Sequence, residues 1–394
     1  MANQKILQKN IKKIYIFQIL SGIFFSIPIM VLFWQNNGLN LTQIMVLQSI
    51  FAIMTAVLEI PTGYFADTYG RKKTLILASV SLFLGISSYS LGHNFMQFII
   101  AEFFFALGIS FISGTKSALV FDTLKDLGQE KEYKKIWGNT LFAGMIALAI
   151  SGILGGFIAS INLRYTLYAS IPFFALLLPV SLSLKEPSKH KNIIKENYGK
   201  ELLKIIKLSL VENKKLKWLI IYSGIIYAFN QASLWLYQPY FKLTGLNIIY
   251  FGIVFASFQI FSAIISKYTY KIEKSLGQKY SLGILIFLLA GSYFLMSNFI
   301  FLFSFSFCFI QQFVRGFRIT IISDYINQIT ESNIRATVLS VESFVGRILC
   351  ATIIPMIGYV ADIYTLPQAL SVLGITTLFI GLIMLVLFKQ RKII

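Results

Sequence analysis

Residues 59–73 read EIPTGYFADTYGRKK, a stretch that leaves an apolar run through a proline and ends in three consecutive cations. On a helix, the eight steps from Glu59 to Asp67 cover about 12 Å. Asp67 would then lie at the end of a membrane-spanning helix while Glu59 lies inside the bilayer. Pro61 removes a backbone donor and permits a bend. We therefore expect a transmembrane helix that ends near Asp67 and reverses through a tight turn at Gly70.

The composition excludes a soluble enzyme. The 394 residues are 56% hydrophobic and 13% charged, whereas about a quarter of an ordinary soluble domain is charged. Apolar runs recur along the chain, and each can cross a hydrocarbon core of roughly 30 Å as a helix. We predict an all-α integral membrane protein with twelve transmembrane helices at residues 14–35, 42–65, 74–92, 95–119, 138–160, 165–184, 217–240, 248–270, 281–297, 299–322, 338–360 and 367–388.

The position of the cations indicates the topology. The net charge is +19, but most Lys and Arg residues fall in alternate loops, which a nucleic-acid surface would not produce. Because Lys and Arg mark the cytoplasmic side, we expect both termini inside, the lipid bilayer as a partner and no nucleic-acid partner. The first apolar segment has no small-residue cleavage site and is expected to remain in the protein. Cys308 and Cys350 lie in predicted spans, so no disulfide framework is expected.

A lysine-rich polar segment at residues 185–216 divides the predicted spans into six and six. We predict an N-terminal six-helix bundle at 1–184, a cytoplasmic linker at 185–216 and a C-terminal six-helix bundle at 217–394. The inner part of the linker, ELLKIIKLSL, is either a short helix on the membrane surface or a solvated tether. Paired halves of this kind are typical of alternating-access transporters.

The GYFADTYGRKK segment resembles the loop signature of the major facilitator superfamily, which Gly63, Asp67, Gly70, Arg71 and Lys72 match. The preceding EIP resembles a variant from a bacterial branch that includes clostridial-type tetracycline exporters. The ATVLS that follows Arg335 and the segment SGTKSALVFDTL at 113–124 are similar to further features of that branch. The resemblance covers the full length and implies the two-bundle fold, a small-molecule substrate and the bacterial cytoplasmic (inner) membrane.

The resemblance also implies a cytoplasmic gate. Asp67 would face the positive end of the eleventh helix near Thr337–Ser340, and Arg71 would pair with Asp122. A carboxylate at a helix N-terminus contributes roughly 0.3 to 1 kcal/mol, and up to about 2 kcal/mol when partly buried. Gly63 would let another helix approach closely. The alternative is that the basic residues only anchor the loop on the inside.

Ionisable side chains interrupt the predicted spans, and each costs at least about 2.5 kcal/mol at mid-bilayer. Glu59 and Lys116 lie at similar depths, so Glu59 either pairs with Lys116 or carries protons. Glu102 has no cation near it in the sequence, and burial disfavours the charged form of a carboxyl group. A group of this kind suits proton loading and release. Glu59 and Glu102 are therefore the candidates for proton coupling.

Four further intramembrane charges lie in the second half, at Arg315, Arg318, Glu342 and Arg347. Arg315 and Arg318 are three residues apart and share a helix face. We expect the four groups to compensate one another. The alternative is that they bind an anionic group of a substrate.

Residues 222–241, YSGIIYAFNQASLWLYQPYF, are unusually polar for a lipid-facing helix. We predict that a cleft for a flat or amphipathic molecule is lined by Tyr227, Asn230, Gln231 and Trp235 together with Arg315. The alternatives are hydrogen bonding between helices and an interfacial aromatic belt. Residues 151–156, SGILGG, supply small residues for close helix packing. They resemble the glycine-rich fifth-helix motif of superfamily antiporters, without its usual proline.

These patterns and the resemblance together predict a monomeric secondary exporter that exchanges external protons for a drug or other small organic compound such as tetracycline. A metabolite or sugar carrier, including a symporter, is the alternative, and a membrane-embedded enzyme is a remote one. The sequence contains no GxxxxGK[ST] phosphate loop, and its two histidines, His93 and His190, are scattered. We therefore expect no catalytic residue, no metal and no cofactor, with the proton gradient as the energy source.

Overall fold

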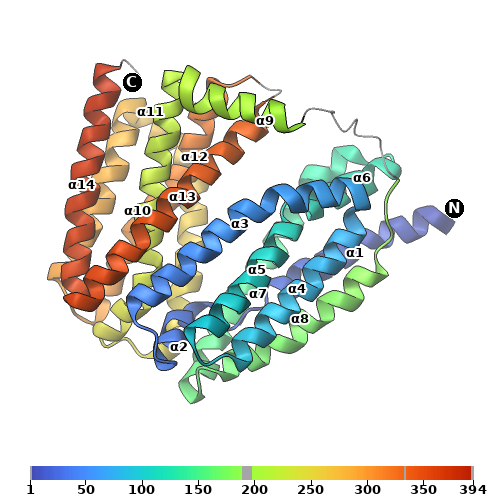
Figure 1. Ribbon diagram of the computed structural model, residues 1–394, viewed down its shortest axis with the longest axis horizontal. Helices are drawn as coiled ribbons and strands as arrows, with labels where there is room; N and C mark the ends of the chain where they lie inside the picture. The colour runs from blue at the N-terminus through green and yellow to red at the C-terminus, as the bar shows by residue number, and fades with distance from the viewer. Residues whose placement is uncertain (1, 189–197, 332–333, 392–394) are drawn as a thin grey trace. The chain divides into compact units, whose positions relative to one another are not determined.

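The computed structural model describes residues 2–188, 198–331 and 334–391, and helices dominate these ranges (Figure 1). Residues 189–197 of the predicted linker, His190 among them, lie outside the described residues. The first half contains α1 (Ala2–Gly22), η1 (Ile27–Ile29), α2 (Met30–Asn36), α3 (Leu41–Tyr69), α4 (Arg71–Leu91), α5 (Phe95–Ile112), α6 (Thr115–Asp126), η2 (Glu130–Glu132), α7 (Tyr133–Ile161) and α8 (Tyr165–Ser183).

The remaining elements are α9 (Tyr198–Lys207), η3 (Leu208–Glu212), α10 (Lys214–Leu243), η4 (Ile248–Tyr250), α11 (Phe251–Asn298), η5 (Leu302–Phe307), α12 (Cys308–Gln328), α13 (Arg335–Ile363) and α14 (Leu366–Gln390). The inner part of the linker is helical, in α9 and η3. The predicted all-α fold is confirmed.

Within the described residues, 10 helical segments are long and apolar enough to cross a membrane. Ile248–Asn298 is one of them and contains two predicted spans, because Gly277 with φ 72° turns the chain inside α11. The predicted span at 299–322 corresponds to η5 and α12. That segment is not among the 10, since Arg315 and Arg318 lower its hydropathy.

Two predicted spans differ from single continuous helices. The span at 14–35 is broken after Gly22 and resumes through η1 into α2. The span at 95–119 is broken between α5 and α6, where Gly114 has φ 73°. Glycine adopts this conformation without steric cost. Pro61, by contrast, lies inside a helix that continues to Tyr69.

Contacts divide the chain into two compact units. The first contains Met1–Leu39, Ile50–Asn192 and Ile248–Ala256, and the second contains Asn40–Ser49, Ile193–Asn247 and Ser257–Ile394. The start of α3 therefore packs with the second unit, and the start of α11 packs with the first. The division into bundles at 1–184 and 217–394 stays a prediction.

Close backbone approach organises the first unit. A Cβ atom on Gly155 of α7 would overlap the carbonyl oxygen of Phe25, which lies in the break between α1 and η1. A Cβ atom on Gly156 would meet the carbonyl oxygen of Ile249 at 2.5 Å. The SGILGG segment is therefore used for tight packing, as small residues in membrane helices commonly are.

In the second unit, α10 packs against α13 (Figure 1). A Cβ atom on Gly224 of α10 would lie 3.4 Å from Cα of Gly346 in α13. Asp362, near the end of α13, accepts hydrogen bonds from the backbone amides of Leu41 at 2.9 Å and Thr42 at 2.6 Å. Its carboxylate thereby caps α3, where a negative charge complements the helix dipole.

Replacing Gly155 with alanine tests the packing of α7. We expect Gly155→Ala to destabilise the protein by roughly 1 to 3 kcal/mol, because the added methyl group meets backbone that cannot move aside cheaply. Gly138→Ala is the matched control in the same helix, since a Cβ atom there has nothing within 4 Å. The measurement is the thermal midpoint of each purified variant in detergent. Equal midpoints for the two variants would contradict the packing described.

Candidate functional site

The turn between α3 and α4 gathers charged side chains that we call the junction cluster: Asp67, Arg71, Asp122 and Glu186. Gly70 has φ 107°, and α4 begins at the next residue. Nη1 of Arg71 lies 2.6 Å from Oδ1 of Asp67, and its Nε lies 3.7 Å from Oδ2 of Asp122 in α6. One guanidinium thus interacts with two carboxylates from two helices.

Glu186 is a member of the junction cluster that the sequence analysis missed. Its two carboxylate oxygens accept hydrogen bonds from the backbone amides of Arg71 and Lys72, each at 2.7 Å. They therefore cap α4 at its positive end. A Cβ atom on Gly70 would lie 2.8 Å from Oε1 of Glu186 and would displace this carboxylate, while the positive φ is what favours glycine at this position. The sequence signal that could have identified Glu186 was an acidic residue shortly after the sixth predicted span.

Gly63 and Asp67 were expected to contact other helices. No described atom lies within 4 Å of the place where a Cβ atom of Gly63 would be, so the expected close helix approach does not occur at that residue. Asp67 lies in the first unit and Thr337–Ser340 lies in the second. The predicted contact between Asp67 and that helix start stays a prediction.

Glu102 is buried between helices of the first unit. Its side chain is 5% exposed and lies beside the hydroxyl of Tyr89 in α4. The Tyr89 ring packs against Phe98 and Phe105, with ring centroids 5.8 and 5.6 Å away. The carboxyl group thus lies next to an aromatic side chain that itself packs against other aromatic rings.

Glu59 and Lys116, the other ionisable residues inside the spans of the first unit, have different partners. Glu59 accepts a hydrogen bond from Oγ of Ser113 at 3.3 Å. Lys116 donates to the side-chain oxygen of Gln18 in α1, and its ammonium group lies 5.7 Å from the centroid of the Phe17 ring. The ammonium group of Lys116 thus has its hydrogen-bond partner on α1. One of the two expectations was that Lys116 pairs with Glu59 instead.

In the second unit, charged side chains of α12 and α13 surround a tyrosine of α10. We call Tyr227, Arg315, Arg318, Glu342 and Arg347 the arginine cluster. Nη1 of Arg318 lies 3.2 Å from Oε1 of Glu342, and the Arg318 guanidinium lies 5.1 Å from the centroid of the Tyr227 ring. Arg315 and Arg347 also act electrostatically on the Tyr227 hydroxyl. The expected compensation is present for Arg318.

Ser223 holds this ion pair in place. Its hydroxyl donates to Oε1 of Glu342 and lies 2.8 Å from Nη1 of Arg318. The side chains of Arg318 and Glu342 are 11% and 18% exposed. A buried ion pair of this kind fixes one geometry, because removing either partner leaves an uncompensated charge.

Arg315 has neutral neighbours instead. Its Nη1 donates to the side-chain oxygens of Gln259 at 3.3 Å and Gln312 at 3.5 Å.

Among the residues predicted to line a cleft, Asn230 donates to the carbonyl oxygen of Gln311 at 3.0 Å. This is the interhelical hydrogen bond that was the alternative to cleft lining. Gln231 and Trp235 are partly exposed on α10.

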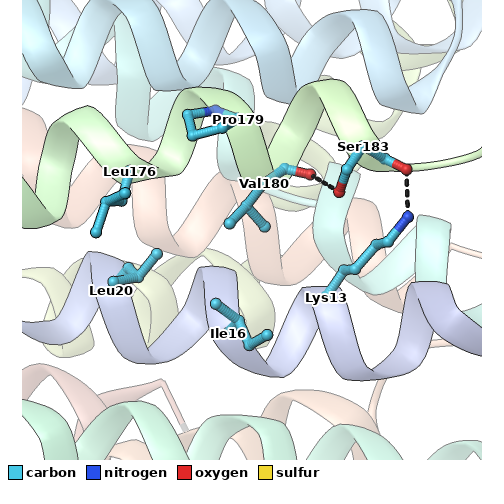
Figure 2. Close-up of a pocket in the computed structure, with 7 residues that line it drawn as sticks. All are labelled: Lys13, Ile16, Leu20, Leu176, Pro179, Val180 and Ser183. Atoms are coloured by element: carbon cyan, nitrogen blue, oxygen red, sulfur yellow. Dashed lines mark hydrogen bonds between the residues drawn. The ribbon is translucent and has the colours of Figure 1, made fainter.

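A groove of about 400 Å³ lies between α1 and α8 (Figure 2). Its walls are mainly apolar and include Ile16, Leu20, Leu176 and Val180. Lys13 closes one end and donates to the carbonyl oxygen of Ser183 (Figure 2). None of the residues predicted to bind substrate or protons lines this groove. Among the described residues, no group of three His, Cys, Asp or Glu side chains could hold a metal ion.

Comparison with known proteins gives one family. The model of the Major Facilitator Superfamily matches residues 14–354. A protein of Bacillus subtilis (strain 168) described as "Uncharacterized MFS-type transporter YxaM" is 27% identical over 277 residues, which are 66% of each chain. "Uncharacterized transporter BU466" of Buchnera aphidicola is 24% identical over 341 residues, 82% of each chain.

Solved structures agree on the fold. The chain superimposes on the nucleoside transporter NupG with a TM-score of 0.80 at 14% identity, over 98% of this chain and 99% of that one. It is also similar to a POT family transporter in complex with 5-aminolevulinic acid, with a TM-score of 0.73 at 16% identity, over 100% of this chain and 96% of that one. At these identities the similarity concerns the fold alone.

Proposed function

Because the chain belongs to the major facilitator superfamily, we propose that it exports a small organic compound, such as the drug tetracycline, in exchange for external protons. The family consists of multi-pass membrane transporters, not enzymes, so the remote alternative of an embedded enzyme is excluded. The resemblance of the EIP segment to tetracycline exporters supports export as the direction of transport and a tetracycline-like drug as the compound. The alternating basic loops support a bacterial cytoplasmic membrane with both termini inside.

The burial of Glu102 is the observation that carries proton coupling. Movement of a carboxyl group between buried and water-exposed surroundings changes its affinity for a proton. A carrier that alternates between two states provides such a change. Glu59 is the second candidate, and its contact with the hydroxyl of Ser113 supports a polar environment there.

The junction cluster is proposed as the cytoplasmic gate, together with Gly63 in α3, Gly70 at the turn and Lys72 at the start of α4. The contacts of Arg71 with Asp67 and Asp122 support this role, since they connect α3, α4 and α6 at one turn. Asp67 is 51% exposed, so it is accessible for the contact with the eleventh helix that the family resemblance implies. The cleft of Tyr227, Asn230, Gln231, Trp235 and Arg315 is proposed as the substrate site.

A carrier for a metabolite or sugar is the second candidate function. The arginine cluster favours it, because guanidinium groups bind the carboxylates and phosphates that many metabolites carry. Direction distinguishes the two candidates. An exporter lowers the internal concentration of a toxic compound, whereas an uptake carrier supports growth on a nutrient.

Resistance in an efflux-deficient bacterium tests the proposed export. We expect the chain to confer resistance to one class in a panel of antibiotics that includes tetracycline, and a protonophore to remove that resistance. Glu102→Gln should also remove it, because an amide cannot carry a proton. Glu132→Gln is the control, since Glu132 is exposed and pairs with Lys135 one turn away. Resistance that survives the protonophore would contradict proton coupling, and rescue of growth on a nutrient would favour uptake.

The gate is tested by Asp67→Asn. The exposed pair with Arg71 should add only about 0.3 to 0.5 kcal/mol of stability, so we expect nearly unchanged expression and thermal midpoint. If Asp67 also stabilises a helix end in one transport state, its loss costs up to about 2 kcal/mol there and slows export by up to about thirtyfold. The measurement is energised transport in membrane vesicles. Undiminished transport would show that the basic loop is only an anchor.

A further inference from the structure

The spans that contribute to the arginine cluster carry more positive than negative charge. In the sequence, residues 299–322 and 338–360 contain Arg315, Arg318 and Arg347 but one acid, Glu342. A cation inside the hydrocarbon region is costly unless a counter-charge or cavity water stabilises it. Among the described residues, Glu342 pairs with Arg318, whereas Arg315 donates to amide oxygens.

Arg315 is the member best placed to receive a ligand. Among the described residues its hydrogen bonds go to the amide oxygens of Gln259 and Gln312, and both leave from Nη1. A guanidinium has five N–H donors in a fixed fork. The hydrogens on Nη2 and Nε are therefore available, and a fork of this kind binds a carboxylate or phosphate through two parallel hydrogen bonds.

Arg318 adds a fixed positive charge on the same side of the helix. It lies one turn from Arg315, where side chains share a face. Its ion pair with Glu342 and its contact with Ser223 hold it over the Tyr227 ring. An aromatic ring with a hydroxyl thus lies where the organic part of a ligand would meet the cations.

We propose that the transported compound carries an anionic group, a carboxylate or a phosphate, and that Arg315 binds this group next to Arg318 and Tyr227. The proposal deepens the second candidate function above, a carrier for a metabolite, and rests on that transport function for the presence of a substrate. Internal pairing explains Arg318 and Glu342 but leaves Arg315 against neutral amides. An anionic substrate would supply the counter-charge that Arg315 does not meet among the described residues.

Binding to the purified full-length chain tests the proposal without requiring transport. The probes are sodium benzoate and sodium phenyl phosphate, with benzamide as the neutral analogue and sodium chloride at equal ionic strength as the reference. We expect both anions, but not benzamide, to raise the thermal midpoint. Arg315→Gln should weaken this apparent binding by about tenfold or more. It should still fold, because it leaves no carboxylate without a partner.

Two variants control the result. Lys242→Gln removes an exposed cation from the end of α10 and should keep the full anion effect. Arg315→Lys keeps the charge but loses the fork, so it should bind the anions more weakly than the unmodified chain while remaining folded. This variant also decides the question if Arg315→Gln does not fold.

Three outcomes would overturn the proposal. They are equal stabilisation by benzamide and benzoate, no stabilisation by either anion, and an anion effect that survives both Arg315 variants. A further measurement identifies the source of the anion. It compares the thermal midpoint in phosphatidylglycerol nanodiscs with that in phosphatidylcholine nanodiscs. Stabilisation by phosphatidylglycerol, without any effect of the soluble anions, would assign the site to a lipid headgroup and overturn the substrate proposal. Because these are binding measurements, a chain that binds anions but confers no proton-dependent resistance would overturn the export function alone.

Discussion

The cost of placing charge in a hydrocarbon core is the constraint on which this structure depends. Several of the intramembrane charges have specific partners that reduce this cost. Lys116 reaches Gln18, Arg318 pairs with Glu342, and Glu102 lies beside Tyr89. The acids of this set lie mainly in the first unit and the cations mainly in the second. That separation supports a division of labour in which the first unit handles protons and the second handles an anionic compound.

The junction cluster shows how a loop becomes a fixed structural element. Gly70 supplies the positive φ that reverses the chain, and Glu186 caps the helix that follows. Arg71 is held from two sides, by its backbone amide and by its guanidinium. Several weak interactions therefore restrain one turn, although the exposed ion pair alone contributes little. A turn restrained in this way can release as a unit when one interaction is lost.

Hydropathy was sufficient to predict the helices, because a backbone in lipid must satisfy its own hydrogen bonds. The breaks near Phe25 and Gly114 were not predicted, since they depend on what packs against each helix. The approach of Arg71 to Asp122 was expected from the family resemblance. Glu186 and Asp362 were missed because each caps a helix that is distant in sequence, a relation that local patterns do not contain. The similar depth of Glu59 and Lys116 in the membrane suggested that they pair. Depth alone could not reveal that Gln18, on another helix, is the hydrogen-bond partner of Lys116.

The central claim is that a carboxyl group buried in the first unit exchanges protons. Infrared difference spectroscopy during a pH titration of the reconstituted chain tests it most directly, because a protonated carboxyl group has its own carbonyl stretching band. The account predicts that this band forms on acidification and that Glu102→Gln removes part of it, while Glu132→Gln does not change the part that belongs to a buried group. Identical spectra for Glu102→Gln and the unmodified chain would contradict the assignment of Glu102 as a proton carrier.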